Sequence, residues 1–338
     1  MILIIFLFFL YSLYYLKFGI YINCKCLTHE NRAYKLRNYN KWYACFNPSI
    51  FEYDSEIFYT YRVAVGGNML NLRRLINVII NKFSYSRIII SNNCDIFSEV
   101  IIPQKYVNLY ERGFEDPRAI VFKDNLLLIV SARNKIHKKN QIFIIIISLL
   151  NLQINKYEIH PKKIIEITPS LIEIQSQKNW MPFIHNSKLH LVYSINPYIV
   201  LQCNISDGTY KKIVETKYNF TNKLRGSSNI IKTSLKDYND IYLGITHYRD
   251  GFIYTHRFYI FDTNFNILKI GKKFVIFGDK ILLINRLTKY IFKYTKYLQL
   301  NTQFISGLHE SKNRYHIMYG HDDSYAKELI LENINNII

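Results

Sequence analysis

The chain has 338 residues, enough for one large domain or two average ones, and its 49% hydrophobic content excludes a wholly disordered protein. The formal net charge of +19 at pH 7 raises the question of nucleic-acid binding, but the lysines are scattered along the chain and do not line one element. We therefore expect a solvated basic surface that attracts anionic ligands, and no nucleic-acid partner.

The first predicted element is an apolar segment at the N-terminus. Residues 2–16 are apolar or aromatic except for Ser12, and Lys17 ends the run. Residues 18–22 extend it to about 20 residues, which is the length of a membrane-spanning helix. The segment has no basic n-region and no A-x-A-like cleavage site.

We therefore expect a signal anchor over residues 1–22 and a linker over residues 23–40. This arrangement predicts a single-pass membrane protein with a luminal or extracellular domain. A cleaved signal peptide, and hence a secreted protein, is the second interpretation, and a buried core segment is the third.

From residue 41 onward, a hairpin pattern recurs five times. Each unit has a short apolar strand, a polar turn rich in Asp, Asn, Ser and Lys, and a longer apolar strand. The units cover Ser49–Ala64, Ala119–Arg133, Pro182–Ile195, Asn229–Tyr248 and Phe304–Gly320.

Most units are followed by a second strand pair. These pairs are expected at Arg87–Ile102, Gln141–His160, Tyr198–Glu215 and His256–Ile276. Two hairpins form a four-stranded sheet that cannot bury its faces alone, so five such sheets should stack radially. The sequence predicts an all-β fold, a five-bladed β-propeller over residues 41–338, and a β-sandwich is the alternative because it also has many short strands.

The cysteines show no metal-binding pattern. Cys24, Cys26, Cys45, Cys94 and Cys203 form no C-x-x-C pair and have no histidine at zinc-ligand spacing. We expect no metal site and no cofactor. Disulfides, and glycosylation at the sequons that begin at Asn204 and Asn219, are relevant only if the domain is luminal or secreted.

Polar residues stand just before the inner strand of each predicted blade. They are Asn47-Pro48, Glu115–Arg118, Lys178–Pro182, Arg225–Ser228 and Ser306-Gly307. Because inner strands run along the propeller axis, we expect these positions to converge on one mouth of the channel. Carboxylate, amide, cationic and aromatic groups together are typical of a sugar site.

At Gly113–Ala119 the sequence GFEDPRA resembles the G-x-E-D-P-R signature of glycoside hydrolase family 130, the β-mannoside phosphorylases, and of the related glycosyltransferase family 108. Further matches to these families occur in the expected order. They are Asn47-Pro48 with Tyr61-Arg62, Lys178–Phe183 with Leu191–Pro197, Arg225–Ser227, Thr246-His247 and Phe304–Asp322. The resemblance covers residues 40–330.

The resemblance implies an enzyme that acts on β-mannosides, as a phosphorylase or as a mannosyltransferase with a sugar-phosphate donor. Oligosaccharide, sugar phosphate and inorganic phosphate are then the expected partners. The aspartate of the signature, here Asp116, is the family's general acid, and it relays its proton through a sugar hydroxyl. Two alternatives stay open: a hydrolase in which Asp322, Glu115 or Glu111 activates water, and a non-catalytic sugar-binding propeller.

The other expected site residues follow from position and residue type. Substrate-binding residues are expected at Asn47, Arg62, Arg118, Asn179, Trp180 and Asp322, and phosphate-binding residues at Arg133, Lys178, Arg225 and His247. Because Arg118 is so close in sequence, a protonated Asp116 requires burial or a guanidinium group turned away from it. Trp180 either stacks on a sugar ring or belongs to the core.

Overall fold

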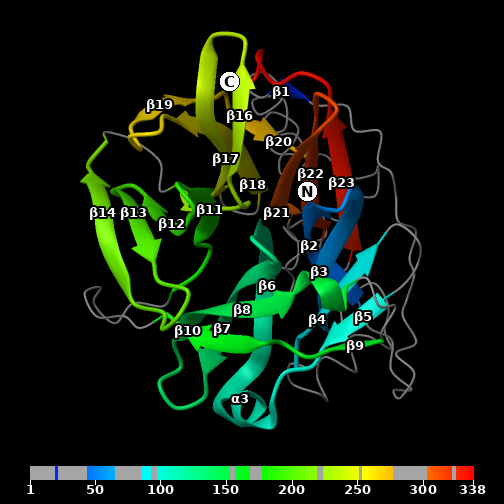
Figure 1. Cartoon of the computed structure of the whole chain (residues 1–338). Coiled ribbons are helices and arrows are strands. Elements are labelled where there is room, and N and C mark those ends of the chain that lie inside the picture. Colours follow the sequence, from blue (N-terminus) through cyan, green and yellow to red (C-terminus); the bar gives the residue numbers. More distant parts are fainter. Residues whose placement is uncertain are drawn as a thin grey trace, which may run out of the picture.

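The computed structural model describes residues 20–21, 44–64, 85–92, 97–152, 157–167, 177–218, 224–250, 253–276, 303–321 and 325–338. These residues form five sheets arranged around a common centre (Figure 1). The five-bladed β-propeller is thereby confirmed, and the β-sandwich alternative is wrong.

Blade 1 contains β2 (Ala44–Tyr53), β3 (Glu56–Ala64), β4 (Arg87–Asn92) and β5 (Phe97–Val100), in that order. Blade 2 contains β6 (Tyr110–Phe122), β7 (Asn125–Asn134), β8 (Asn140–Ser148) and β10 (Lys163–Glu166). A short helix, α3 (Gln104–Leu109), precedes blade 2, and a 3-10 turn (Leu149–Asn151) follows β8. Blade 3 contains β11 (Met181–His185), β12 (Lys188–Ile195), β13 (Tyr198–Cys203) and β14 (Tyr210–Thr216).

In blade 4 the innermost strand is interrupted, and both of its pieces pair with the same neighbour. The pieces are β15 (Arg225–Gly226) and β16 (Ile231–Leu235), and the neighbour is β17 (Tyr238–Asp250). β18 (Ile253–Phe261), β19 (Ile267–Ile270) and β20 (Phe274–Val275) complete the blade, and β1 (Ile20–Tyr21) pairs with β20 in parallel. Blade 5 contains β21 (Gln303–Ser311), β22 (Arg314–His321) and β23 (Tyr325–Leu331).

All five predicted hairpins are present, as β2–β3, β6–β7, β11–β12, β16–β17 and β21–β22. The prediction of a second pair within Gln141–His160 is wrong in its second strand. That strand, β9 (Glu158–Ile159), pairs in parallel with β5 of blade 1, and the outer strand of blade 2 is β10. The crossing covers the otherwise open edge of blade 1, and exposed edges favour unwanted strand pairing.

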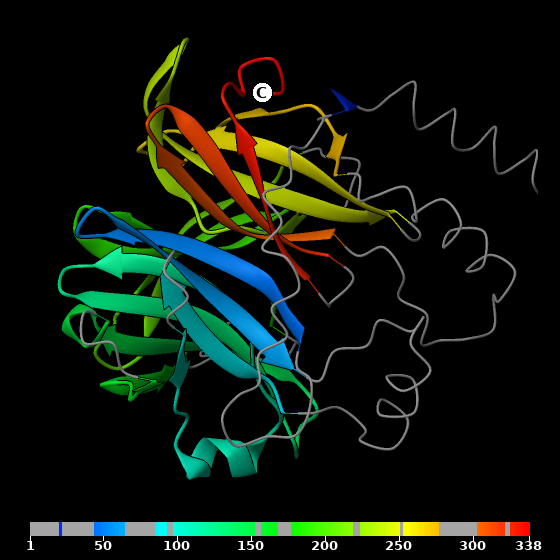
Figure 2. The same cartoon turned by 90° about the vertical axis from the view of Figure 1, so that its right-hand side faces the viewer.

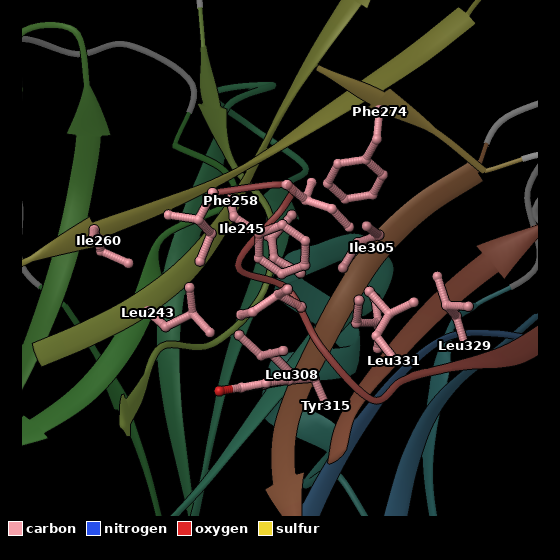
Figure 3. Close-up of a cluster of buried hydrophobic side chains, with 14 of the residues drawn as sticks. Leu243, Ile245, Phe258, Ile260, Phe274, Ile305, Leu308, Tyr315, Leu329 and Leu331 are labelled. Atoms are coloured by element: carbon pink, nitrogen blue, oxygen red, sulfur yellow. The ribbon is translucent and has the colours of Figure 1, made fainter. Parts of the chain in front are cut away.

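Apolar side chains fill the space between each blade and the next. Buried clusters lie between blades 1 and 2, 2 and 3, 3 and 4, 4 and 5, and 5 and 1. Figure 3 shows the cluster between blades 4 and 5, where Phe258 and Phe274 face Ile305 and Leu331. Burial of this kind on both faces of every sheet is the main source of stability for a propeller.

Hydrogen bonds connect each blade to the next around the ring. The joining pairs are Ala119 N to Ser49 Oγ, Gln177 N to Asn140 O, Ile230 N to Pro182 O, Leu308 N to Asn229 Oδ1 and Ser306 Oγ to Pro48 O, at 2.6–3.0 Å. In Figure 2, blade 5 (orange and red) lies beside blade 1 (blue), so the last blade closes directly on the first.

Some predictions fall on residues outside the described part of the chain. They are those for residues 2–16, the linker at 23–40, Cys24, Cys26, Cys94, Asn219 and Asp322. Two residues of the expected anchor, Ile20 and Tyr21, lie in a strand, which differs from the expected helical continuation to residue 22. Within the described residues, no helix has the length and apolar character needed to cross a membrane.

Candidate active site

The inner strands of blades 1 and 2 both bulge where the polar motifs occur. On β2, Phe46 pairs with Arg62 but Ser49 pairs with Thr60, so Asn47 and Pro48 leave the regular ladder. On β6, Glu115 pairs with Ser131 and Arg118 with Ile129, so Asp116 and Pro117 do the same. The motifs thus lie inside the strands and not just before them, because a bulge tolerates a proline and turns a side chain out of the ladder.

At these positions the backbone takes a left-handed conformation that most residues avoid. The φ angles are 48° at Asn47, 54° at Asp116 and 63° at Asn179, which precedes β11 in blade 3. Asn and Asp tolerate this region because their short polar side chains can bond locally. In each of three successive blades, one Asn or Asp therefore adopts the same left-handed backbone conformation.

Asp116 is the centre of this arrangement. Its Oδ1 accepts hydrogen bonds from Asn47 Nδ2 at 2.7 Å and from Arg62 Nη1 at 3.1 Å. No hydrogen bond from the described residues reaches Oδ2. The residue is 9% exposed, so the carboxylate is buried with one oxygen held by protein and the other available to a ligand.

Burial alone would raise the pKa of Asp116, but nearby cations and an amide donor outweigh it. The charges of Arg62 and Lys178, the Asn47 hydrogen bond and the charge of Arg118 together hold the pKa below its ordinary value. Asp116 is therefore ionised at neutral pH. The guanidinium group of Arg118 is turned away from this carboxylate, as proton transfer requires, but Arg62 takes its place.

Glu115 is held at both of its oxygens. Oε1 accepts from Arg62 Nη2 at 2.7 Å, and Oε2 accepts from Lys178 Nζ at 3.1 Å. Its side chain is 3% exposed, whereas that of Lys178 is 40% exposed. Arg62 thus bridges the two carboxylates, and Glu115 holds both Arg62 and Lys178 beside Asp116.

Arg118 is buried and binds main-chain and amide oxygens of three blades. Nε donates to Ser227 O at 2.6 Å, Nη1 to Asp116 O at 3.2 Å and Nη2 to Asn179 Oδ1 at 3.2 Å. Arg118 makes no salt bridge to the adjacent Glu115, because Arg62 and Lys178 occupy that carboxylate.

Arg225 and His247 are paired neighbours on β15 and β17. Arg225 is exposed, so its charge is available to a ligand. Burial, together with His256 and the charges of Arg118 and Arg225, holds the pKa of His247 well below its ordinary value. His247 is therefore neutral, and it can offer a phosphate a ring nitrogen but no positive charge.

Two expected ligands lie elsewhere. Trp180 is 4% exposed and packs edge-on against Tyr193 and Tyr210 in the cluster between blades 2 and 3, so its ring lies in the core. Arg133 forms an ion pair with Glu111 at 3.3 Å, in a group that also includes Lys138. Arg133 is near the end of β7, which lies beside the start of β6, where Glu111 is. The charge of Arg133 is therefore paired with Glu111.

Sequence reasoning missed three contributors. Ser86 Oγ accepts from Arg62 Nε at 3.0 Å, the Phe46 ring lies 5.1 Å from the Arg62 guanidinium carbon, and the Phe304 ring lies 5.6 Å from that of Arg118. Ser86 belongs to no motif. The two phenylalanines are adjacent to expected strand positions, but nothing in their spacing marks them as partners of arginine.

The assembled site combines one available carboxylate oxygen with excess positive charge. Arg62, Arg118 and Lys178 outnumber Glu115 and Asp116, which leaves a net positive charge. Such a site can move a proton at Asp116 Oδ2 and attract an anion at the exposed Lys178 and Arg225. Within the described residues, no cluster of His, Cys, Asp or Glu is arranged to hold a metal ion.

The fold is shared with solved structures of glycoside-active propellers. A structure of glycoside hydrolase family 130, the mannoside phosphorylases, has a TM-score of 0.54 at 14% identity, covering 86% of this chain and 84% of that one. A β-1,2-mannobiose phosphorylase from Listeria innocua has a TM-score of 0.52 at 14% identity, covering 85% and 89%. At these identities the likeness establishes the five-bladed fold.

One curated protein matches in sequence. Beta-mannosyltransferase 3 of Komagataella phaffii is 23% identical, over 62% of this chain and 38% of its own length. The chain thus spans about two fifths of the relative's length. No protein-family model matches the chain.

Proposed function

We propose that the protein is a carbohydrate-active enzyme that acts on β-mannosides, as a mannosyltransferase with a sugar-phosphate donor or as a phosphorylase. The observation that carries this is the Asp116 carboxylate, which is buried, held at Oδ1 by Asn47 and Arg62, and open at Oδ2. The mannosyltransferase in Komagataella phaffii and the mannobiose phosphorylase of the same fold support the substrate class.

The charge state of Asp116 favours the transfer direction. With its pKa below the ordinary value, Asp116 is at neutral pH in the ionised form that can accept a proton. In transfer, the acceptor hydroxyl gives up its proton to Asp116, directly or through a sugar hydroxyl, while its oxygen bonds to the anomeric carbon. The phosphate leaves with the electrons of the broken bond, and Lys178 and Arg225 stabilise its charge. Phosphorolysis reverses these steps and requires protonated Asp116.

The experiment is to incubate the full-length chain with mannose 1-phosphate and mannose and to measure released phosphate together with the disaccharide formed. Asp116→Asn keeps the shape of the side chain and an oxygen acceptor but cannot carry the proton. Its turnover should fall by a factor of about 100 to 10,000, whereas sugar binding is retained. Turnover of Asp116→Asn at the wild-type rate would remove this residue from the mechanism.

Two other outcomes identify the alternatives. Cleavage of a mannobiose without any phosphate requirement would make the protein a hydrolase. The protein would be a sugar-binding propeller if it binds mannosides but turns over none of the possible substrates, namely phosphate-activated mannose, nucleotide-activated mannose and mannobiose. Glu115 is a poor water-activating base because cations bind both of its oxygens. Glu111 is likewise paired with Arg133 and Lys138, so neither of these two described carboxylates favours hydrolysis.

We also propose that the N-terminal segment anchors the protein in a membrane, with the propeller on the luminal or extracellular side. The apolar run of residues 2–16 and the exposed sequon at Asn204 support this. The full-length chain should remain with membranes in high salt, and a variant lacking residues 1–19, which keeps β1, should not. A glycosidase-sensitive size shift that Asn204→Gln abolishes would establish the side; recovery of the intact chain in the salt-washed soluble fraction would contradict the anchor.

A further inference from the structure

Arg118 has an unusual position for a residue of an active-site motif. It is 3% exposed, and each of its three nitrogens serves a different acceptor. The acceptors belong to Ser227, Asp116 and Asn179, of which two lie in other blades. A guanidinium group suits this task because it presents its donors in a rigid fork.

The contacts of Arg118 reach four of the five blades. Asp116 is in blade 2, Asn179 leads into blade 3 and Ser227 joins the two inner pieces of blade 4. The ring of Phe304, in blade 5, lies 5.6 Å from the guanidinium carbon. Blades 3 and 4 meet closely here, since a Cβ on Gly226 would stand 2.1 Å from Asn179 O.

What Arg118 binds in Asp116 is the main-chain oxygen and not the carboxylate. The carboxylate is bound by Asn47 and Arg62 instead. A non-glycine residue at φ 54° is conformationally strained and persists only where its surroundings hold it. Arg118 is the group that binds the backbone of this turn.

We propose that Arg118 is a positioning residue that holds the Asp116 turn in its left-handed conformation by tying blade 2 to blades 3 and 4, and that it is not a ligand of the sugar. The proposal rests on the proposed function only in taking Asp116 as the proton-transfer group. It reassigns Arg118 from the substrate-binding role that the motif suggests. It also makes the geometry of the site depend on closure of the ring.

The test uses Arg118→Lys in the full-length protein, because lysine keeps the charge but offers one nitrogen in place of three. A relaxed turn would move Oδ1 away from Asn47 and Arg62. We expect kcat to fall by about 10- to 100-fold with little change in KM, as for a small misplacement of a reacting group. We also expect the Asp116 carboxyl to titrate at higher pH, measured by carbon-13 NMR and identified by its absence in Asp116→Asn.

The matched control is Arg257→Lys. Arg257 is also partly buried and donates to a main-chain oxygen, that of Gly271 at 2.9 Å, but within blade 4 alone. It should leave kcat and the Asp116 titration unchanged. An Arg118→Lys protein with normal kcat and raised KM would show direct substrate binding and overturn the proposal, and so would a wild-type titration curve for Asp116.

A second variant keeps the proposal testable if Arg118→Lys does not fold. Asn179→Gly removes one acceptor of Arg118 while a glycine keeps φ 63° accessible. It should raise the pH at which Asp116 titrates, and where both variants fold, the double variant should show no larger shift than Arg118→Lys alone. If Asp116 titrates in Asn179→Gly as it does in the wild type, the proposed positioning role of Arg118 is contradicted. If the wild type turns over no mannoside, the proposed function fails, but the titration still decides the role of Arg118.

Discussion

At the residue scale, Glu115 and Asp116 are adjacent carboxylates with different tasks. Both oxygens of Glu115 are occupied by cations, whereas Asp116 keeps Oδ2 open. The difference arises from the bulge, which leaves Glu115 paired with Ser131 and takes Asp116 out of the ladder. We infer that Glu115 organises the cations and that Asp116 carries the proton.

Glu115→Gln should therefore destabilise the fold as well as the site. The variant leaves Arg62 and Lys178 without their shared counter-charge, and the loss should be about 1.5–3 kcal/mol in the free energy of unfolding. Urea denaturation measures it. The control Glu215→Gln, at an exposed pair with Lys212, should show no measurable change, and an equally stable Glu115→Gln would contradict the assignment.

Arg62→Met should shift the acid limb of the pH–rate profile. Arg62 is the cation that most lowers the pKa of Asp116, so its removal lets burial raise that pKa. In the transfer direction the active form is the carboxylate, so activity is lost as pH falls through the pKa. The half-activity point of Arg62→Met should thus lie at higher pH than that of the wild type. A profile that does not move would mean that Arg62 does not set the charge of Asp116.

Arg118 shows how much of the site sequence alone can predict. The motif identifies Asp116, because its chemistry is tied to a recognisable string of residues. The task of Arg118 is not predictable in this way, since its acceptors include the main-chain oxygen of Ser227, 109 positions away. The same holds for Asn47, which meets Asp116 across 69 positions.

At the element scale, the hairpins are predictable because their determinants are local. Alternating apolar residues and short polar turns specify β11–β12 and β21–β22 almost to the residue. The crossing of β9 to blade 1 is not predictable, because it depends on an edge created by residues far earlier in the chain. The turn at Pro103 that precedes α3 likewise gives no periodic signal, as the helix is only 6 residues long.

A buried histidine in the pair β17–β18 makes the free energy of unfolding depend on pH. His256 is fully buried there, Nε2 lies 2.9 Å from Gln303 O, and burial lowers its pKa to about 4, against the opposing effect of that carbonyl. The folded state then binds fewer protons than the unfolded state, whose histidines titrate near pH 6.5. Stability is therefore full above that pH and falls as the pH drops toward 4, by up to about 1.4 kcal/mol per pH unit for one histidine.

His256→Gln should flatten this dependence, because glutamine can still donate to Gln303 O but does not titrate. Urea unfolding at pH 7, 5.5 and 4.5 measures the difference. His137→Gln, on the exposed β7–β8 turn, is the control and should keep the wild-type slope. Identical slopes for all three proteins would mean that His256 does not contribute to the acid sensitivity.

At the scale of the whole molecule, the site exists only where the ring is closed. Asp116 receives its partners from blade 1, and the Arg118 fork reaches blades 3 and 4. Blade 5 joins on either side, through Asn229 of blade 4 and Pro48 of blade 1. Opening any interface therefore disturbs the geometry at the centre, which argues for one cooperative unfolding transition.

The interface of blades 4 and 5 offers the sharpest test of that cooperativity. The C-terminal segment enters it, with Ile334 1% exposed and Lys272 N donating to Ile337 O at 2.7 Å. Ile334→Ala should cost about 2–5 kcal/mol in the free energy of unfolding, because the cavity between the sheets cannot fully collapse. Ile136→Ala, at a side chain that is 76% exposed, should change it by no more than about 0.5 kcal/mol.

Two spectroscopic probes distinguish a closed ring from independent blades in Ile334→Ala. Far-ultraviolet circular dichroism follows all the sheets, and the fluorescence of Trp180, with Trp42→Phe as the background, follows the interface of blades 2 and 3. If the ring unfolds as one unit, both transitions shift together to lower denaturant, although Trp180 lies in a different interface from Ile334. A Trp180 transition that stays at the wild-type midpoint would show that the blades unfold separately, and the coupling of ring closure to the active site would be wrong.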